Sequence, residues 1–90
     1  MQYEWDSEKR AINLAKHGVD FAYIEGFEWD SALTVSEIRF GERRYVAVGN
    51  VAGRLHVVIY SRRGRNRRII SFRKANRREE RCYEQARRVN

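Results

Sequence analysis

Four segments with the residue pattern of β-strands follow one another between residues 29 and 74, joined by short connectors that contain glycine. A parallel pair of strands needs a crossover connection of about a dozen residues or more, and these connectors are too short for that. We therefore expect consecutive strands to pair antiparallel, as a meander. The predicted strands are Trp29–Glu37, Glu42–Gly49, Arg54–Arg62 and Asn66–Lys74.

Helical signals precede the meander. Gln2–Trp5 reads as a short strand, and Asp6 after it is a typical helix N-cap. Gly18 can take the left-handed conformation that ends such a helix. A second, shorter helix is expected from Asp20 to near Gly26.

A further helix follows the meander. Asn76 and Glu79 have the spacing of a capping box, and apolar side chains then recur at helical intervals. Cys82 on that apolar side is expected to be buried. The set is Cys82, Tyr83, Ala86 and Val89. The prediction is one α+β domain over residues 1–90, a small antiparallel sheet with two N-terminal helices and one C-terminal helix, in the order β-α-α-β-β-β-β-α.

Side-chain alternation in the last two strands divides the sheet into two faces. We expect the helices to cover the face with Leu55, Val57, Ile59, Ile70 and Phe72. The other face is then partly polar and could serve as a platform for RNA. It presents His56, Tyr60, Arg62, Ser71 and Arg73.

Positive charge is concentrated in the last third of the chain. The 90 residues carry a formal net charge of +7, and residues 62–90 alone hold twelve Lys/Arg against three Asp/Glu. Eleven of those twelve cations are arginine, which binds phosphate bidentately and stacks on bases. This bias favours a phosphate-bearing partner, with nucleic acid the first choice and an acidic protein the alternative. A single cysteine and the lack of a long apolar run predict a cytoplasmic protein.

The sequence contains no CxxC, HExxH, P-loop or dinucleotide-binding motif, so no metal and no cofactor are predicted. A ribonuclease that uses the 2′-hydroxyl of RNA as nucleophile needs groups that move protons and cations that hold the phosphorane. Proton transfer is assigned to His56, Tyr60 or His17. The phosphate is assigned to Arg62 and Arg73, with Arg68 in support, and flanking RNA to Lys16, Lys74, Arg77, Arg78 and Arg81. Structural roles remain open: His17 can stabilise a helix C-terminus, Tyr60 can pack, and the arginines can be surface charges.

The residues also resemble a known family. The opening Tyr3-Glu4-Trp5-Asp6, then Lys9, Asn13, Lys16-His17-Gly18-Val19 and Phe21, is similar to the N-terminal signature of the BrnT toxins. Further matches are Glu42-Arg43-Arg44, Gly49, Gly53-Arg54-Leu55, Val57-Val58, Tyr60, the stretch Arg68-Ile69-Ile70-Ser71-Phe72-Arg73-Lys74-Ala75, Glu79 and Tyr83.

The resemblance implies a toxin of a type II toxin–antitoxin system with a RelE/ParE-like fold. Such a toxin is an endoribonuclease that inhibits translation. It is neutralised by a BrnA-like antitoxin with a ribbon-helix-helix DNA-binding element, in a heterotetramer that binds operator DNA. Two alternatives remain open: a non-catalytic nucleic-acid-binding regulator, and a ParE-like gyrase poison.

Overall fold

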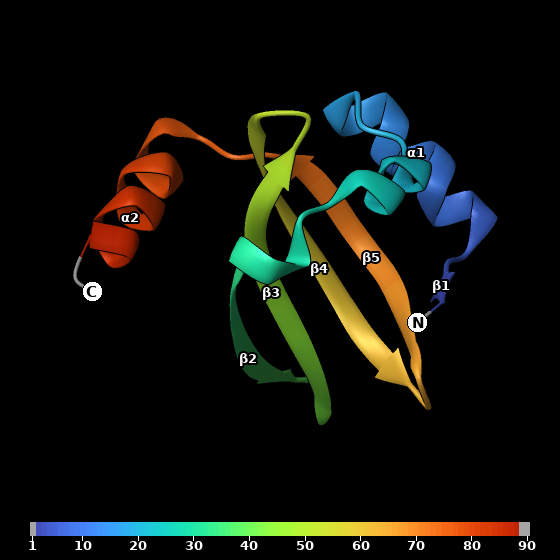
Figure 1. Ribbon diagram of the computed structural model, residues 1–90. Coiled ribbons are helices and arrows are strands. Elements are labelled where there is room, and N and C mark those ends of the chain that lie inside the picture. The colour runs from blue at the N-terminus through green and yellow to red at the C-terminus, as the bar shows by residue number, and fades with distance from the viewer. Residues whose placement is uncertain (1, 89–90) are drawn as a thin grey trace.

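The structure is a computed structural model that describes residues 2–88 of the 90-residue chain. It contains one five-stranded sheet, two α-helices and two short 3-10 helices (Figure 1). Their order along the chain is β1 (Tyr3–Glu4), α1 (Ser7–His17), η1 (Phe21–Gly26), η2 (Trp29–Ser31), β2 (Leu33–Arg39), β3 (Glu42–Val51), β4 (Arg54–Arg63), β5 (Asn66–Lys74) and α2 (Arg77–Arg88).

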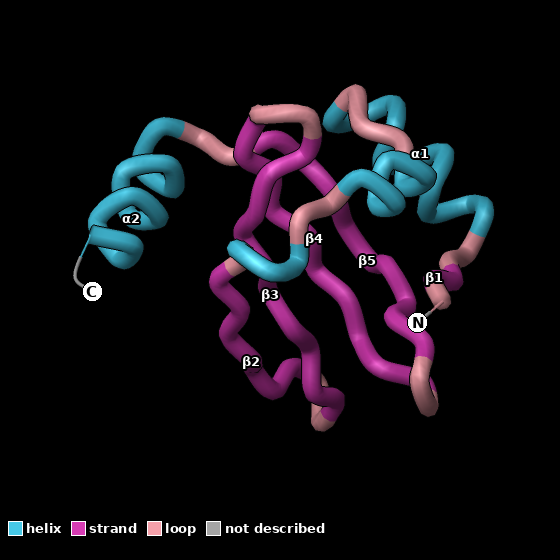
Figure 2. The backbone as a smooth tube through the Cα atoms, viewed as in Figure 1, coloured by secondary structure: helices cyan, strands magenta, loops and turns pink. Residues whose placement is uncertain are grey.

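The strands lie in the sheet in the order β1-β5-β4-β3-β2. Strands β2 to β5 form an antiparallel meander, and β1 pairs parallel with β5 at its outer edge. The α+β class and the meander are therefore confirmed. Figure 2 shows how α1 and η1 lie toward the β5 side of the sheet, while α2 lies beyond β3.

The helical elements differ from the prediction in kind and number. The second N-terminal helix is a 3-10 helix, η1. A further 3-10 turn, η2, occupies residues 29–31, so β2 begins at Leu33 and not at Trp29. The caps of α1 are as expected: Asp6 accepts from the Glu8 amide, and Gly18 is left-handed with φ 71°.

The assignment of the two faces was wrong. Helices α1 and η1 cover the face that carries Val58, Tyr60 and His56, which are all buried. Phe72 pairs with Val58, not with Val57, and so belongs to that covered face. The core there consists of Val19, Phe21, Ile24, Phe27, Ala47, Val58, Tyr60, Ile69 and Phe72.

A β-bulge in β5 explains why Phe72 was placed on the wrong face. Ser71 pairs with Ile59 and Ile69 pairs with Tyr60, so Ile70 has no partner across the β4–β5 ladder. The extra residue shifts the alternation by one, which places Ile69 and Phe72 on the same side of the sheet. Strict alternation from the sequence cannot produce that arrangement.

Helix α2 packs loosely at one end of the opposite face. Its one buried residue is Tyr83, which joins Leu55, Val57 and Ala75 in a small second core and donates to the carbonyl oxygen of Ser31. The other apolar residues named for this helix do not behave as predicted: Cys82 and Ala86 are exposed, and Val89 lies outside the described residues. Among residues 2–88, no helix is long and apolar enough to cross a membrane.

Candidate active site

The side chain of Asn13 fastens α1 to the outer edge of β5. Strand β1 ends at Glu4, opposite Arg68, so beyond that point the outer edge of β5 has no strand partner. Asn13 supplies one: its amide donates to the carbonyl oxygen of Phe72 at 2.7 Å and its oxygen accepts from the Phe72 amide at 3.2 Å. It also donates to the carbonyl oxygen of Val19. Asn13 is the one buried residue of α1.

The position of Asn13 determines which face of α1 meets β5. Residues three or four positions apart share a helix face, so Lys9, Lys16 and His17 lie on the same side as Asn13. They line a cavity of about 270 Å³ between α1 and β5. Its other walls are Ile12, Asn13, Ile70 and Ser71. We call this cavity the α1–β5 pocket.

The environment of His17 favours a neutral imidazole. Partial burial, followed by the positive charges of Lys16 and Arg73, lowers the pKa of His17 below its ordinary value of 6.5. A neutral imidazole at the pH of the cell can accept a proton. The charge of Arg73 acts on His17 although the two residues are 56 positions apart in the chain.

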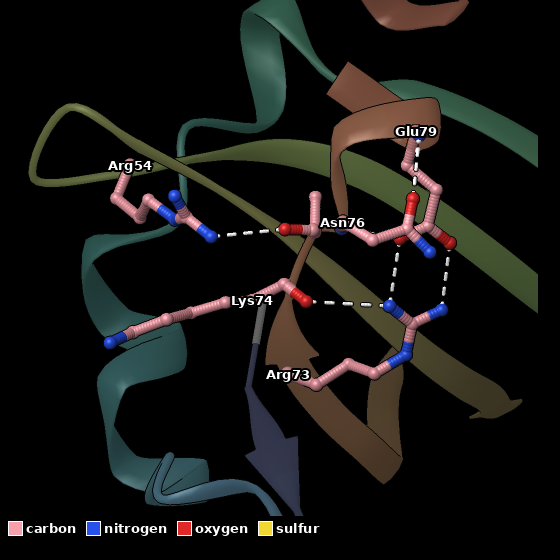
Figure 3. A network of polar contacts seen from close by, with 6 residues as sticks. Arg54, Arg73, Lys74, Asn76 and Glu79 are labelled. Carbon is pink, nitrogen blue, oxygen red and sulfur yellow. Dashed lines mark hydrogen bonds and ion pairs between the residues drawn. The ribbon is translucent and has the colours of Figure 1, made fainter. Parts of the chain in front are cut away.

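Arg73 is held in a bidentate ion pair with Glu79. Both terminal nitrogens of the guanidinium donate to the carboxylate at 2.8 Å, and one also donates to the carbonyl oxygen of Lys74 (Figure 3). The pair raises the pKa of Arg73 and lowers the pKa of Glu79. Arg73 is therefore charged and fixed in orientation, and its Nε takes no part in these contacts.

Glu79 also begins helix α2. Its carboxylate accepts from the Asn76 amide, and its own amide donates to the side chain of Asn76, which completes the predicted capping box. The contacts of Glu79 thus join the end of β5 to the start of α2. Lys74 points to the opposite side of β5 from Arg73 (Figure 3).

Two of the arginines assigned to the phosphate lie at the other end of the sheet. Arg62 pairs with Arg67 and Ser61 pairs with Arg68, at the β4–β5 hairpin. At about 3.3 Å per residue, Arg67 lies about 20 Å along β5 from Arg73. Arg68 forms an ion pair with Glu4 at 3.2 Å. The structure therefore brings His17 and Lys16 together in one pocket, with Arg73 near enough for its charge to act on His17, but leaves Arg62 and Arg68 apart from them.

His56 and Tyr60, expected on an open face, are buried. The His56 ring packs against Phe72, and its Nδ1 lies 2.7 Å from the carbonyl oxygen of Arg54. A carbonyl oxygen can only accept, so Nδ1 carries the proton in this contact. Burial lowers the pKa of His56. The Tyr60 ring stacks on Tyr45 at 5.2 Å.

The remaining basic residues are exposed. Lys74 ends β5, and the other three lie on α2, a helix whose outer surface is rich in arginine. Their exposure permits contact with a polyanion but does not bring them to a common point. They are Lys74, Arg77, Arg78 and Arg81.

Sequence reasoning missed residues that the structure places at the pocket. Lys9 and Asn13 precede His17 by eight and four residues, the spacing of one helix face, so helical periodicity could have found them. Ser71, predicted only as part of a polar sheet face, lines the pocket from β5, and Glu79, predicted only as a helix cap, also holds Arg73. No local pattern could have found these two, because their roles depend on how β5 meets α1 and α2.

The charged groups at the pocket are cations, which repel a metal ion, and His17 alone is one metal ligand where a protein site uses three or four. Over the described part of the chain, no three His, Cys, Asp or Glu side chains gather as a metal-binding group would.

One comparison with known proteins identifies a match. A family model described as "Ribonuclease toxin, BrnT, of type II toxin-antitoxin system" matches residues 5–79. The matched segment contains both sides of the α1–β5 pocket and ends at Glu79. No curated protein matches the sequence.

Proposed function

The chain belongs to the BrnT family of ribonuclease toxins of type II toxin–antitoxin systems, and we propose that it cleaves RNA without a metal ion at the α1–β5 pocket. One observation carries the proposal: a partly buried histidine lines one pocket with Lys9 and Lys16, and its pKa is lowered by burial and by the charges of Lys16 and Arg73. A base that is neutral at pH 7, surrounded by cations, suits attack on a phosphodiester.

The chemistry follows from these groups. The imidazole of His17 takes the proton of the 2′-hydroxyl, and the resulting oxygen attacks the adjacent phosphorus. The bond from phosphorus to the 5′-oxygen breaks, and the leaving oxygen takes a proton from the ammonium group of Lys9 or Lys16. The products are a 2′,3′-cyclic phosphate and a free 5′-hydroxyl.

Arg73 stabilises the extra negative charge of the phosphorane. Its terminal nitrogens are bonded to Glu79, which fixes the plane of the guanidinium, and its Nε remains available to a phosphate oxygen. Removing a preorganised donor of this kind lowers the rate about 10²- to 10³-fold. Glu79 is in this scheme a positioning residue.

RNA on either side of the cleaved bond lies against the exposed cations of β5 and α2. In this proposal Arg77, Arg78 and Arg81 contact flanking phosphates on one side of Arg73, and Lys74 contacts the strand from the other face of β5. These contacts are electrostatic, so they strengthen binding with little preference for sequence.

The partner in the cell is proposed to be a BrnA-like antitoxin with a ribbon-helix-helix element, in a heterotetramer that binds operator DNA. Membership of a type II toxin–antitoxin family implies an antitoxin, and the net charge of +7 favours an acidic one. We further propose that residues 1–90 form one cytoplasmic domain with a RelE-like fold. The antiparallel meander with flanking helices supports that assignment.

The test uses protein purified free of antitoxin, incubated with cellular RNA in excess EDTA. Wild type should cleave and leave 2′,3′-cyclic phosphate ends, whereas His17→Gln and Arg73→Gln should lose at least about 100-fold in rate. The matched control is Arg39→Gln, which removes an exposed arginine from β2 and should cleave normally.

Two results would contradict the proposal. Cleavage that stops in EDTA would show that the reaction needs a metal. Full activity of a folded His17→Gln variant would place the proton acceptor elsewhere. If wild type is inactive on free RNA, the same reaction is repeated with translating ribosomes, and the same two criteria apply.

A further inference from the structure

Arg62 and Arg67 lie directly opposite each other on the same face of the sheet, at the hairpin end of β4 and β5. The Cβ atoms of such a pair are about 4.5–5.5 Å apart, and like charges at that spacing destabilise the sheet. Within residues 2–88, neither guanidinium takes part in an ion pair. An anion placed between the two would remove this repulsion.

Arg67 is held in position by aromatic rings. The carbon at the centre of its guanidinium lies 3.6 Å from the centre of a Trp29 ring and 5.4 Å from that of Tyr60. Its Nε is buried without a hydrogen-bond partner. A guanidinium restrained in this way loses little further freedom when it binds a ligand.

Arg62 ends a short column of stacked groups. Tyr60 stacks on Tyr45 at 5.2 Å, and the guanidinium of Arg62 lies 5.4 Å over the ring of Tyr45. Arg62 is exposed, while Tyr45 is half-buried. Bases of single-stranded RNA stack on tyrosine rings and on arginine planes, so the outer end of this column offers a place for one base.

We use the name arginine–aromatic cluster for five residues: Trp29, Tyr45, Tyr60, Arg62 and Arg67. We propose that this cluster is a second RNA subsite, which binds a backbone phosphate between Arg62 and Arg67 and a base at the Tyr45–Arg62 end of the column. A cavity of about 470 Å³ next to it, lined by Gln2, Arg62, Gly64, Arg65 and Asn66, has the volume of a small-ligand site and adds a further cation.

This subsite is separate from the cleaving site. Arg67 lies about 20 Å along β5 from Arg73, so one phosphate cannot contact both. A dinucleotide can fill only the α1–β5 pocket, whereas a longer strand can reach the cluster. The inference takes its ligand, RNA, from the proposed function, but RNA binding at the cluster can be measured whether or not the protein cleaves.

The binding experiment uses the His17→Gln variant, so that RNA stays intact, and a fluorescent single strand of about 12 nucleotides, within the site sizes of single-strand binders. Arg62→Gln and Arg67→Gln should each weaken binding about tenfold and reduce the slope of log Kd against log salt by about 0.7. Tyr45→Leu should weaken binding about tenfold with an unchanged slope, because stacking carries no charge. Arg39→Gln, which removes a charge elsewhere, should change Kd less than about twofold.

Arg67→Lys separates the charge of Arg67 from the planar geometry of its guanidinium. It keeps the charge but loses the planar fork, so it should keep the wild-type salt slope while binding RNA more weakly. Circular dichroism of each variant establishes that it is folded.

The second measurement compares the cleavage of a dinucleotide with the cleavage of the longer strand. Here each cluster variant keeps the wild-type His17, so that it can cleave. The cluster variants should cleave the dinucleotide at the wild-type rate and the longer strand with a raised KM. Equal losses on both substrates would place the cluster in the cleaving site and overturn the proposal.

Two further results would overturn it. The proposal is wrong if folded Arg62→Gln and Arg67→Gln variants bind RNA with the wild-type Kd. It is also wrong if the variants lose affinity for the antitoxin and keep their affinity for RNA, because the surface would then belong to a protein interface. A wild type that binds RNA through the cluster but never cleaves would contradict the proposed function and leave this inference standing.

Discussion

Asn13 and Phe72, 59 residues apart in the chain, form a pair of hydrogen bonds in which a side-chain amide takes the place of a neighbouring strand. The amide of Asn13 carries a donor and an acceptor side by side, as a peptide group does. It therefore satisfies both backbone groups of Phe72 at an edge that β1 is too short to cover.

Replacing Asn13 with Ala should lower the free energy of unfolding by about 2–3 kcal/mol, because buried backbone groups of Phe72 and Val19 lose their partners. Urea denaturation measures the change. Gln85→Ala, at an exposed position of α2, is the control and should stay within about 0.5 kcal/mol of wild type. A loss below about 1 kcal/mol for Asn13→Ala would mean that water replaces the amide at the edge of β5.

Gly49 on β3 leaves room for an aromatic ring. A Cβ atom at this position would lie 2.7 Å from the Cζ atom of Phe27 and 3.1 Å from the Cβ atom of Ala32. Gly49→Ala should therefore lower the free energy of unfolding by about 1–3 kcal/mol through overpacking. Gly26→Ala is the matched control, since its Cβ would meet only Val51, at 3.6 Å. Equal melting temperatures for the two variants would contradict this account.

The pH dependence of cleavage should report the protonation of His17. The base must be neutral, so kcat/KM should rise with pH through a midpoint below 6.5, the ordinary pKa of histidine. Lys16→Gln should move that midpoint to higher pH, because the imidazolium would lose a neighbouring positive charge. The rate of Lys16→Gln will also fall, but the midpoint is the diagnostic quantity.

Arg39→Gln is the control for the pH profile, because it removes a charge far from the pocket and should leave the midpoint in place. A midpoint that Lys16→Gln lowers, or leaves unchanged, would show that the titrating group is not His17.

The ion pair of Arg73 and Glu79 should oppose RNA binding. The carboxylate of Glu79 occupies both terminal nitrogens of Arg73 and repels phosphate. Glu79→Gln retains an oxygen that can cap α2 but removes the charge, so the Kd for RNA should fall several-fold. The free energy of unfolding should fall by about 1 kcal/mol, since the two side chains are 31% and 28% exposed.

Glu80→Gln is the matched control for the ion-pair prediction. It removes a carboxylate from the same turn of α2, where Glu80 lies 3.9 Å from Arg54. Equal gains in RNA affinity for the two variants would mean that net charge alone matters, and that the contact with Arg73 has no special effect.

The sequence predicts the meander and the caps of this fold well, because both depend on local signals. Glycine-containing connectors fix the strand order, and Asp6, Gly18, Asn76 and Glu79 mark helix ends by chemistry that acts within four residues. The faces of the sheet could not be predicted in the same way. They depend on which face the helical segments cover and, within β5, on a bulge at Ile70 that the alternation of its side chains does not indicate.

Part of the candidate site could be predicted because some of its features are local in the sequence. Lys16 and His17 are neighbours in the chain, and Arg73 lies in its arginine-rich last third. Their proximity, however, depends on the contact between Asn13 and β5. His56 and Tyr60 are buried because the helical segments before β2 cover their face of β4, and the local sequence does not show which face is covered.

Because of the bulge, β5 should tolerate the deletion of Ile70 better than the deletion of residues outside the bulge. Removing a residue of β5 outside the bulge would turn the side chains on one side of the gap over to the other face of the sheet. Removing Ile70 would instead leave Ile69 next to Ser71, with every remaining side chain on its present side of the sheet. The strand therefore contains one residue that its architecture does not require, and that residue forms part of the wall of the α1–β5 pocket.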